Sequence, residues 1–249
     1  MPVNPWAAAL AGALCLAGPL LPPTASVSGR SFPDDSDHWA GYVAYQGPYR
    51  QVSATWAQPA ATTPSAGPCR HGALTLWAGL GGYSSGSLAQ AGTSFGTPGV
   101  GNGQAWWELS PAAMMPVPLY VRPGHKVSVQ VSYAGGGRFD FTIKDLTTGA
   151  SWSHREGSSA PPDLSTAEVI AERPCLAHCG APSAAYAPLA RFKQVTFAAA
   201  RADGRPLGDV SSYQEQMYTQ ALPTGSPLAA PSPFSASGTG FSVRQSGCS

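Results

Sequence analysis

The chain has 249 residues, of which 14 are basic and 13 acidic, so the formal net charge is +1. Charged residues make up only 11% of the sequence, which leaves no basic field to capture nucleic acid or an anionic membrane; neither partner is expected. The 29 glycines and 25 prolines interrupt almost every short stretch and exclude long helices. A chain with few carboxylates changes its charge little as the pH falls, which suits an acidic medium.

The N-terminal residues have the features of a signal peptide. An apolar run of small residues at 7–21 is followed by Thr24-Ala25-Ser26, which suits cleavage. The run contains glycine and proline and is shorter than the roughly 20 residues that a membrane-spanning helix needs. We therefore predict a signal peptide over residues 1–26, a single domain over residues 27–249, and a secreted, extracellular monomer that does not associate with membranes after cleavage.

Short runs rich in Val, Thr and aromatic residues predict strands between the helix breakers. Apolar and polar residues alternate over 126–133, the chain reverses at Gly135-Gly136-Gly137, and further runs follow at 139–144 and 150–154, which predicts an antiparallel meander. Other strands are expected at 39–45, 52–58, 73–80, 87–92, 104–109, 167–172, 192–198, 213–219 and 241–245. The Pro- and Gly-rich segments 60–68, 96–103 and 222–233 are expected to be loops. The predicted fold class is all-β, a two-sheet antiparallel β-sandwich.

Four cysteines follow the predicted signal peptide: Cys69, Cys175, Cys179 and Cys248. An even number in an exported chain indicates disulfides, with three possible pairings. Cys175 and Cys179 could close a small loop, which would leave Cys69 for Cys248. A zinc site is the alternative because His178 precedes Cys179. No second Cys/His pair has ligand spacing, so we expect no metal.

Two glutamates share one face of the strand predicted at 167–172. Alternation with a period of two residues places Glu168, Ile170 and Glu172 together. The simplest interpretation is a solvated outer face, because glutamate is rarely buried without a partner. A functional interpretation needs support from elsewhere in the chain.

That support comes from the strand predicted at 104–109, where Gln104, Trp106 and Glu108 share a face. A tryptophan beside a glutamate on the face turned away from the core predicts a concave groove that grips an extended ligand, because indole is a rigid apolar wall with a polar handle. The alternative is a bulky side chain that merely covers the sandwich. Trp39 and Trp77, in other predicted strands, favour the groove.

The order of short motifs resembles the glutamic peptidases, or eqolisins. The matching segments are HWAGY at 38–42, VSATWAQP at 52–59, WAGLGG at 77–82, LAQAG at 88–92, AWWE at 105–108, DLTTG at 145–149 and AEVIAE at 167–172. The resemblance implies a concanavalin-like sandwich of two seven-stranded antiparallel sheets with a concave substrate groove. It also implies an endopeptidase that acts on polypeptide substrates at acidic pH, with a Gln and Glu pair and no metal or cofactor.

The resemblance also implies roles for individual residues. By motif position the catalytic pair is Gln90 and Glu172, the last acid of its strand rather than Glu168. The positions that match the substrate-binding cleft are Trp39, Trp77, Trp106 and Glu108. In this chemistry a carboxylate takes a proton from water and later returns it, while the amide donates a hydrogen bond to the oxyanion.

Two departures from the family pattern concern acids near the implied site. Gly81 stands where the family usually has Asp, and Gln104 stands where an acid often precedes the Ala-Trp pair. Two other functions remain open from the residues alone. One is a non-catalytic module that binds peptides or glycans in an aromatic groove. The other is a glycosidase that uses Glu108 and Glu172 as its carboxyl pair.

Overall fold

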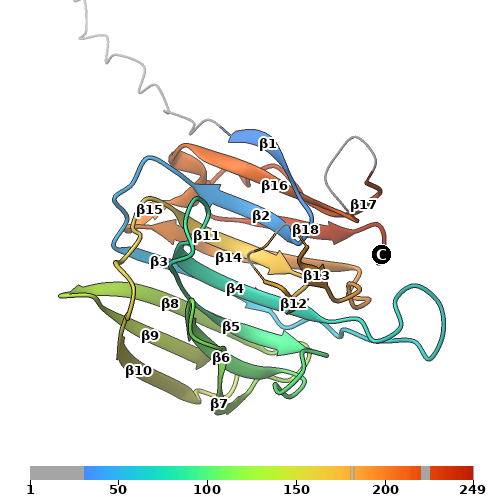
Figure 1. Cartoon of the computed structure of the whole chain (residues 1–249). Coiled ribbons are helices and arrows are strands. Elements are labelled where there is room, and N and C mark those ends of the chain that lie inside the picture. The colour runs from blue at the N-terminus through green and yellow to red at the C-terminus, as the bar shows by residue number, and fades with distance from the viewer. Residues whose placement is uncertain (1–30, 180, 182, 220–224, 249) are drawn as a thin grey trace, which may run out of the picture.

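The computed structural model describes residues 31–179, 181, 183–219 and 225–248, and its strands form a two-layer β-sandwich (Figure 1). The signal peptide predicted at 1–26 lies outside the described residues. Within the described part, helical structure is limited to one 3-10 turn, η1 (Leu207–Asp209). None of the helical structure in these ranges is long and apolar enough to cross a membrane.

Most strands pair into one antiparallel ladder that folds over where β17 meets β16, so that its two halves pack against each other. The first sheet has the spatial order β10 (Ser151–Gly157), β9 (Arg138–Asp145), β8 (Lys126–Gly135), β3 (Gln51–Ala57), β14 (Gln194–Ala202), β18 (Phe241–Gln245) and β17 (Pro227–Pro231). The second sheet has the order β16 (Ser212–Tyr218), β2 (Trp39–Ala44), β11 (Ala167–Glu172), β4 (Leu74–Gly81), β5 (Leu88–Phe95), β6 (Gln104–Leu109) and β7 (Met115–Tyr120). Each sheet thus has seven strands along the ladder, as the resemblance implies.

Four short strands complete the structure. β1 (Ser31–Ser36) lies parallel to β16, and β15 (Arg205–Pro206) pairs with β14. β12 (Cys175–Ala177) and β13 (Ala185–Tyr186) form a separate two-stranded sheet beyond the end of β11.

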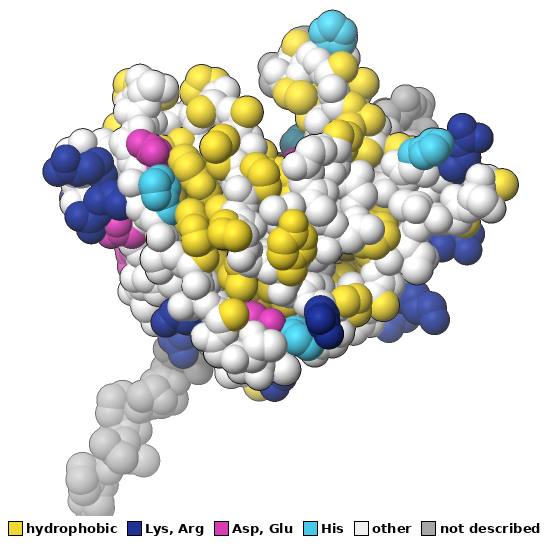
Figure 2. All heavy atoms as spheres, turned by 90° about the horizontal axis from the view of Figure 1, so that it is seen from below, with side chains coloured by type: hydrophobic (Ala, Val, Ile, Leu, Met, Phe, Trp, Pro, Cys, Tyr) yellow, Lys and Arg dark blue, Asp and Glu magenta, His cyan; other side chains and the backbone are white. Residues whose placement is uncertain are grey.

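The core lies between the two sheets, where each strand contributes alternate side chains. In β8 the valines at 127, 129 and 131 are fully buried while the serines and glutamine between them are partly exposed, which confirms the predicted alternation. Trp56, Phe141 and Phe197 are among the largest buried side chains of this layer, and burying the side chain of each stabilises the fold by roughly 2–3 kcal/mol. Seen from below, hydrophobic side chains gather in a hollow between two projections, and most Lys and Arg side chains lie toward the edges (Figure 2).

The sequence predicted twelve of the fourteen strands of the ladder, with ends within about four residues, and missed β7 and β17, which contain proline; the four short strands were not predicted either. The segment 222–233, expected to be a loop, contains β17, which begins and ends with proline. β7 carries Pro116 and Pro118 at exposed positions, with Val117 and Leu119 buried between them. Because β7 ends the ladder, the missing N–H groups break no inter-strand bond that the sheet needs.

The described residues contain two disulfides, and these follow the pairing in which the close cysteines join each other. Cys175 bonds Cys179, and Cys69 bonds Cys248 across 179 residues. In the chain-entropy model the long link stabilises the fold by about 5 kcal/mol and the short one by about 2 kcal/mol. The long disulfide therefore fastens the C-terminal end of the chain to the loop before β4.

Candidate active site

Five adjacent strands of the second sheet, β2, β11, β4, β5 and β6, point alternate side chains away from the core between the sheets. Residues that pair directly across antiparallel strands lie on the same face, so the registers define three rows. The first row is Trp39, Glu172, Thr75 and Ser94; the second is Gly41, Ile170, Trp77, Gly92 and Trp106; the third is Val43, Glu168, Gly79, Gln90 and Glu108. All six residues predicted for the site therefore share this face.

The three predicted tryptophans form one cluster on this face. The rings of Trp39 and Trp77 meet edge to face with centroids 5.1 Å apart, and Trp106 lies in the same row as Trp77. Gly92 separates these two in the row, and a Cβ there would lie 2.0 Å from the Leu76 carbonyl oxygen. The missing side chain gives the indoles room above the sheet.

The tryptophans are covered rather than open to solvent, which differs from the expected exposed groove wall. Trp77 and Trp106 have no exposed surface and Trp39 is 8% exposed. Large apolar side chains, Tyr83, Val100, Met114 and Tyr213, pack against the cluster. Alternation identified the face correctly, but it carries no information about the loops that fold over that face.

Glu172 is held at the end of β11 by two donors. The Trp77 indole N–H donates to Oε2 at 2.7 Å and the Thr75 hydroxyl donates to the same oxygen at 3.3 Å. Burial raises the pKa of Glu172, while the nearby His38 and the hydrogen bonds from Trp77, Trp39 and Thr75 oppose the rise. A fixed carboxyl whose pKa lies above its ordinary value is suited to accept a proton and return it in acid solution.

Glu108 and Gln90 are direct partners across β6 and β5. Burial raises the pKa of Glu108 to about 7, and the charge of Glu172 adds to the rise, while the Ser110 hydroxyl, 2.6 Å away, and the Gln90 amide oppose it. Glu108 is therefore mostly protonated in acid. Gln90 is 6% exposed, and its Oε1 has no hydrogen-bond partner among the described residues. Glu108 thus interacts with both members of the predicted pair.

Gln90 and Glu172 lie on one face but in different rows. The glutamate in the row of Gln90 is Glu168, on the far side of Gly79, whereas Glu172 is two rows away. Glu168 is fully buried, and neither carboxyl oxygen has a partner within hydrogen-bond distance in the described part of the chain. Burial raises its pKa well above the ordinary value. The interpretation of Glu168 as a solvated outer-face residue is therefore wrong, because β2, β4 and the covering loops enclose it.

The structure explains both departures from the family pattern. Gly81 has φ +79°, and a Cβ there would lie 2.5 Å from the Asp163 carbonyl oxygen, so glycine is required. The Asp163 carboxylate accepts from the Gly82 N–H and the Ser85 hydroxyl, so an acid from another segment lies beside position 81, which sequence reasoning missed. The Gln104 amide accepts from Gly101 N–H at 2.7 Å and donates to a β7 carbonyl at 3.1 Å, which is a structural role.

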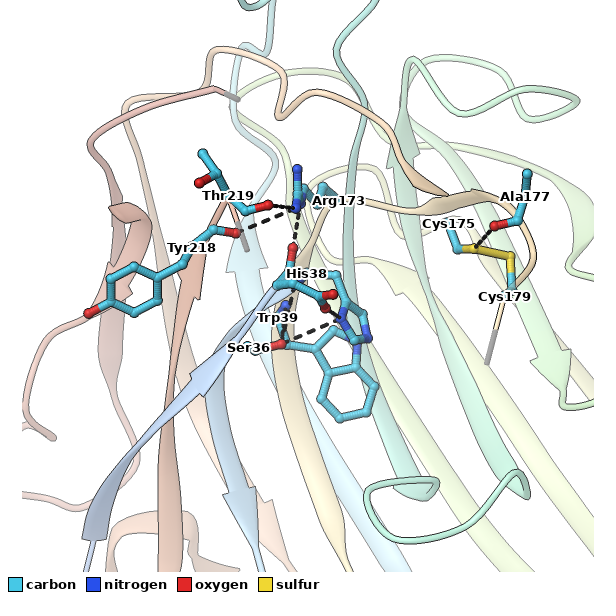
Figure 3. Close-up of polar contacts among 10 residues, drawn as sticks. Ser36, His38, Trp39, Arg173, Cys175, Ala177, Cys179, Tyr218 and Thr219 are labelled. Atoms are coloured by element: carbon cyan, nitrogen blue, oxygen red, sulfur yellow. Dashed lines mark hydrogen bonds and ion pairs between the residues drawn. A yellow bond between two sulfur atoms is a disulfide. The ribbon is translucent and has the colours of Figure 1, made fainter. Parts of the chain in front are cut away.

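A second group that sequence reasoning missed surrounds the end of β11 (Figure 3). The guanidinium of Arg173 is buried and donates to the backbone carbonyls of Asp37 and Thr219, which joins β11 to the β1–β2 turn and to the end of β16. His38 pairs with the Asp37 carboxylate at 2.5 Å and stacks on Tyr186 with centroids 4.5 Å apart. The HWAGY motif includes His38, but the spacing of the motif does not predict that His38 stacks on Tyr186.

The site contains no metal-binding constellation: in the described ranges, no three His, Cys, Asp or Glu side chains are grouped to hold an ion. The arrangement is instead one of carboxyls, an amide and indoles, whose chemistry is proton transfer and hydrogen bonding.

Solved structures of three glutamic peptidases are among those that share the fold. Scytalido-glutamic peptidase with a transition state analog inhibitor has a TM-score of 0.68 and 22% identity, over 85% of this chain and 99% of that one. SCP-B, a member of the eqolisin family in a complex with the tripeptide Ala-Ile-His, has a TM-score of 0.61 and 21% identity over the same shares. Aspergilloglutamic peptidase from Aspergillus niger has a TM-score of 0.54 and 23% identity, over 70% of this chain and 99% of that one.

No curated protein matches the chain significantly. The model of the Peptidase A4 family matches residues 37–222, which covers every row of the site described above. The match spans most of the chain, so it decides between the functions that the residues alone left open. The chain belongs to the Peptidase A4 family, the eqolisins, and is a glutamic endopeptidase.

Proposed function

We propose that this peptidase is secreted, acts in acid, and hydrolyses peptide bonds by direct attack of water with Glu172 and Gln90 as its catalytic pair. The observation that carries the proposal is the Glu172 carboxyl, fixed by Trp77 at 2.7 Å on the face where the Gln90 amide oxygen is buried without a partner. Buried polar groups are normally paired, so an unpaired amide oxygen on the same face as a fixed carboxyl is what a substrate or water would complete.

Glu172 acts first as a base. Its carboxylate takes one proton from the attacking water while the water oxygen bonds to the carbonyl carbon of the substrate. It then returns this proton to the leaving nitrogen as the C–N bond breaks, so one group serves both steps and no cofactor is consumed. Trp77 and Thr75 both donate to Oε2 and so hold the carboxyl in place for this step.

Gln90 stabilises the negative charge that develops on the substrate oxygen. Its amide N–H donates a hydrogen bond and keeps the same charge at every pH, whereas a histidine would be protonated in acid. A preorganised donor of this kind contributes about 10²- to 10³-fold to the rate.

Glu108 supports action in acid. Because burial raises its pKa to about 7, it is neutral in acid and charged above neutral pH. A second carboxylate beside Glu172 would repel the developing oxyanion. Activity is therefore expected to fall as the pH rises through about 7.

Export is part of the proposal because both disulfides suit an oxidising compartment and residues 1–26 have the composition of a signal peptide. The substrates are polypeptides, which the partly exposed apolar side chains packed over the tryptophan cluster would hold. We propose a monomer without nucleic acid or membrane partners, consistent with the low charge.

The test is cleavage of a denatured protein between pH 2 and 7 by the wild type, Glu172→Gln and Gln90→Ala, each checked for folding by circular dichroism. We expect wild-type cleavage in acid, no measurable cleavage by Glu172→Gln, and a loss of about 10²- to 10³-fold for Gln90→Ala. Wild-type activity only above pH 7, or a fully active Glu172→Gln, would contradict the proposal. Release of reducing sugar from a polysaccharide would instead favour the glycosidase pair Glu108 and Glu172.

A further inference from the structure

A stack of three tyrosines lies at one edge of the tryptophan cluster. Tyr213 belongs to β16, Tyr45 directly follows β2, and Tyr83 lies in the loop between β4 and β5. The Tyr213 ring stacks on Tyr45 with centroids 4.5 Å apart and on Tyr83 with centroids 5.3 Å apart, at interplanar angles of 26° and 19°. Three segments that are distant in the sequence therefore build one aromatic surface.

The stack lies on the Gln90 side of the site. Tyr213 pairs with Val43, which places it at the end of the row that contains Gln90. β4 passes from the row of Glu172 through the row of Gln90 and ends two residues before Tyr83. Neighbouring rows are about 7 Å apart along a strand, and an extended peptide repeats its side chains on one face at the same interval. A substrate side chain close to the cleaved bond therefore reaches the tyrosines.

The loop that carries Tyr83 is held in place by Asp163. One oxygen of this carboxylate accepts from the Gly82 N–H at 3.2 Å and from the Ser85 hydroxyl at 2.7 Å. The other oxygen accepts from the N–H and the hydroxyl of Ser165 at 2.9 and 2.6 Å. The loop is thus fixed before a ligand arrives, and a preorganised surface loses little conformational freedom on binding.

The groups around the stack favour an uncharged substrate side chain. The partly buried side chains that pack on the tryptophan cluster, Tyr83 and Tyr213 among them, are all uncharged. Both oxygens of Asp163 already accept hydrogen bonds, and Glu168 and Glu215 are buried. These acids offer a lysine or arginine of the substrate no uncommitted carboxylate, whereas an aromatic ring gains apolar contact and stacking.

We propose that Tyr83 and Tyr213, backed by Tyr45, form the wall of a subsite that selects a large aromatic side chain of the substrate, close to the cleaved bond on the Gln90 side. Both tyrosines are only partly buried, so each keeps surface for a substrate ring. The substrate ring extends the stack. This inference rests on the proposed catalytic roles of Gln90 and Glu172 and adds the class of substrate that the site prefers.

The test compares kcat/KM at pH 4 for fluorogenic peptides that differ only in phenylalanine, lysine or alanine at one position, scanned along the peptide. Mass spectrometry locates the cleaved bond. We expect the wild type to prefer phenylalanine over alanine by about 10²-fold at one position near that bond. Tyr83→Ala should reduce this preference at least about tenfold and change kcat/KM for the alanine peptide less than about threefold. Tyr83→Phe keeps the ring and should keep the preference.

A tyrosine of the other sheet provides the control. Tyr133 lies on β8 and packs on Phe139 with ring centroids 5.3 Å apart, so Tyr133→Ala should leave the preference unchanged. Folding of each variant is checked by circular dichroism. If Tyr83→Ala does not fold, Tyr213→Ala removes the neighbouring ring of the same wall and should lower the preference in the same direction.

Equal losses for the phenylalanine and alanine peptides in Tyr83→Ala or Tyr213→Ala would overturn the inference and leave the tyrosines a purely structural role. A wild-type preference for lysine, or no preference for phenylalanine at any position, would overturn it as well. Binding of the same peptides to Glu172→Gln, measured by fluorescence polarisation, separates the two levels. If that variant cleaves but still prefers phenylalanine, only the proposed function fails; if it is inactive and binds both peptides equally, only the inference about the subsite fails.

Discussion

Two buried amides lie on opposite sides of the second sheet and differ in how their oxygens are satisfied. Between the sheets, Gln58 Oε1 accepts from the Thr93 hydroxyl at 2.7 Å, and the Trp56 indole N–H lies 3.4 Å from the same oxygen. On the outer face, Gln90 Oε1 has no partner among the described residues, and neither has the indole nitrogen of Trp106. An interior built only for stability pairs its polar atoms, so unpaired ones mark the face that a ligand completes.

Replacing Gln90 or Gln58 with alanine should give the largest contrast between an effect on activity and an effect on stability. Gln90→Ala is expected to lower kcat by about 10²- to 10³-fold with little change in the free energy of unfolding. Gln58→Ala should leave kcat within a few-fold but lower the free energy of unfolding by about 1–3 kcal/mol, because Trp56 and Thr93 lose their acceptor. Peptide cleavage at pH 4 and urea denaturation measure the two quantities. A folded Gln58→Ala as inactive as Gln90→Ala would remove the distinction between the two faces.

Trp77 and Trp56, whose indole N–H groups donate hydrogen bonds on opposite faces of the second sheet, offer a smaller contrast. Trp77→Phe removes the donor to Glu172 and is expected to lower kcat/KM about 10-fold and to raise the pH of the acid limb, because a carboxylate that loses a hydrogen bond is protonated more easily. Trp56→Phe should act on stability instead, by about 1 kcal/mol. Steady-state kinetics across pH, with thermal unfolding of both variants, separates these effects. An unmoved limb in Trp77→Phe would mean that the 2.7 Å bond does not tune Glu172.

The smallest expected effect on activity concerns the buried acid Glu168. Its folded pKa is raised, so the folded state holds the proton more tightly than the unfolded state. Its contribution to stability is complete below about pH 4.5 and is lost as the pH rises through the folded pKa, by up to about 1.4 kcal/mol per unit. Melting temperatures between pH 3 and 8 should therefore decline less steeply for Glu168→Gln than for the wild type. The exposed Glu156→Gln is the control, and an equal slope in all three proteins would contradict the assignment.

Alternation along the strands predicted the sandwich, the shared face of Glu168 and Glu172 and the shared face of Trp106 and Glu108, because the period of side chains in a strand is fixed. The other residues predicted for the site, Gln90 among them, came from the resemblance to the family. Alternation failed for β7 and β17, because proline normally argues against a strand. The prolines of these two strands are tolerated at exposed or terminal positions. Alternation also failed for Glu168, since burial of that face depends on loops distant in the sequence. The pairing of Asp163 with the loop after Gly81, and the stack of His38 on Tyr186, are long-range contacts that no spacing encodes.

The central claim is that Glu172, rather than Glu168, is the glutamate of the catalytic pair, and the same substitution at each position tests it most directly. Both residues lie on one strand and one face, and both are buried or partly buried. Initial rates of peptide cleavage at pH 4 should fall at least about 10³-fold for Glu172→Gln and stay within about threefold of wild type for Glu168→Gln, with both variants folded. An inactive Glu168→Gln beside an active Glu172→Gln would contradict the account.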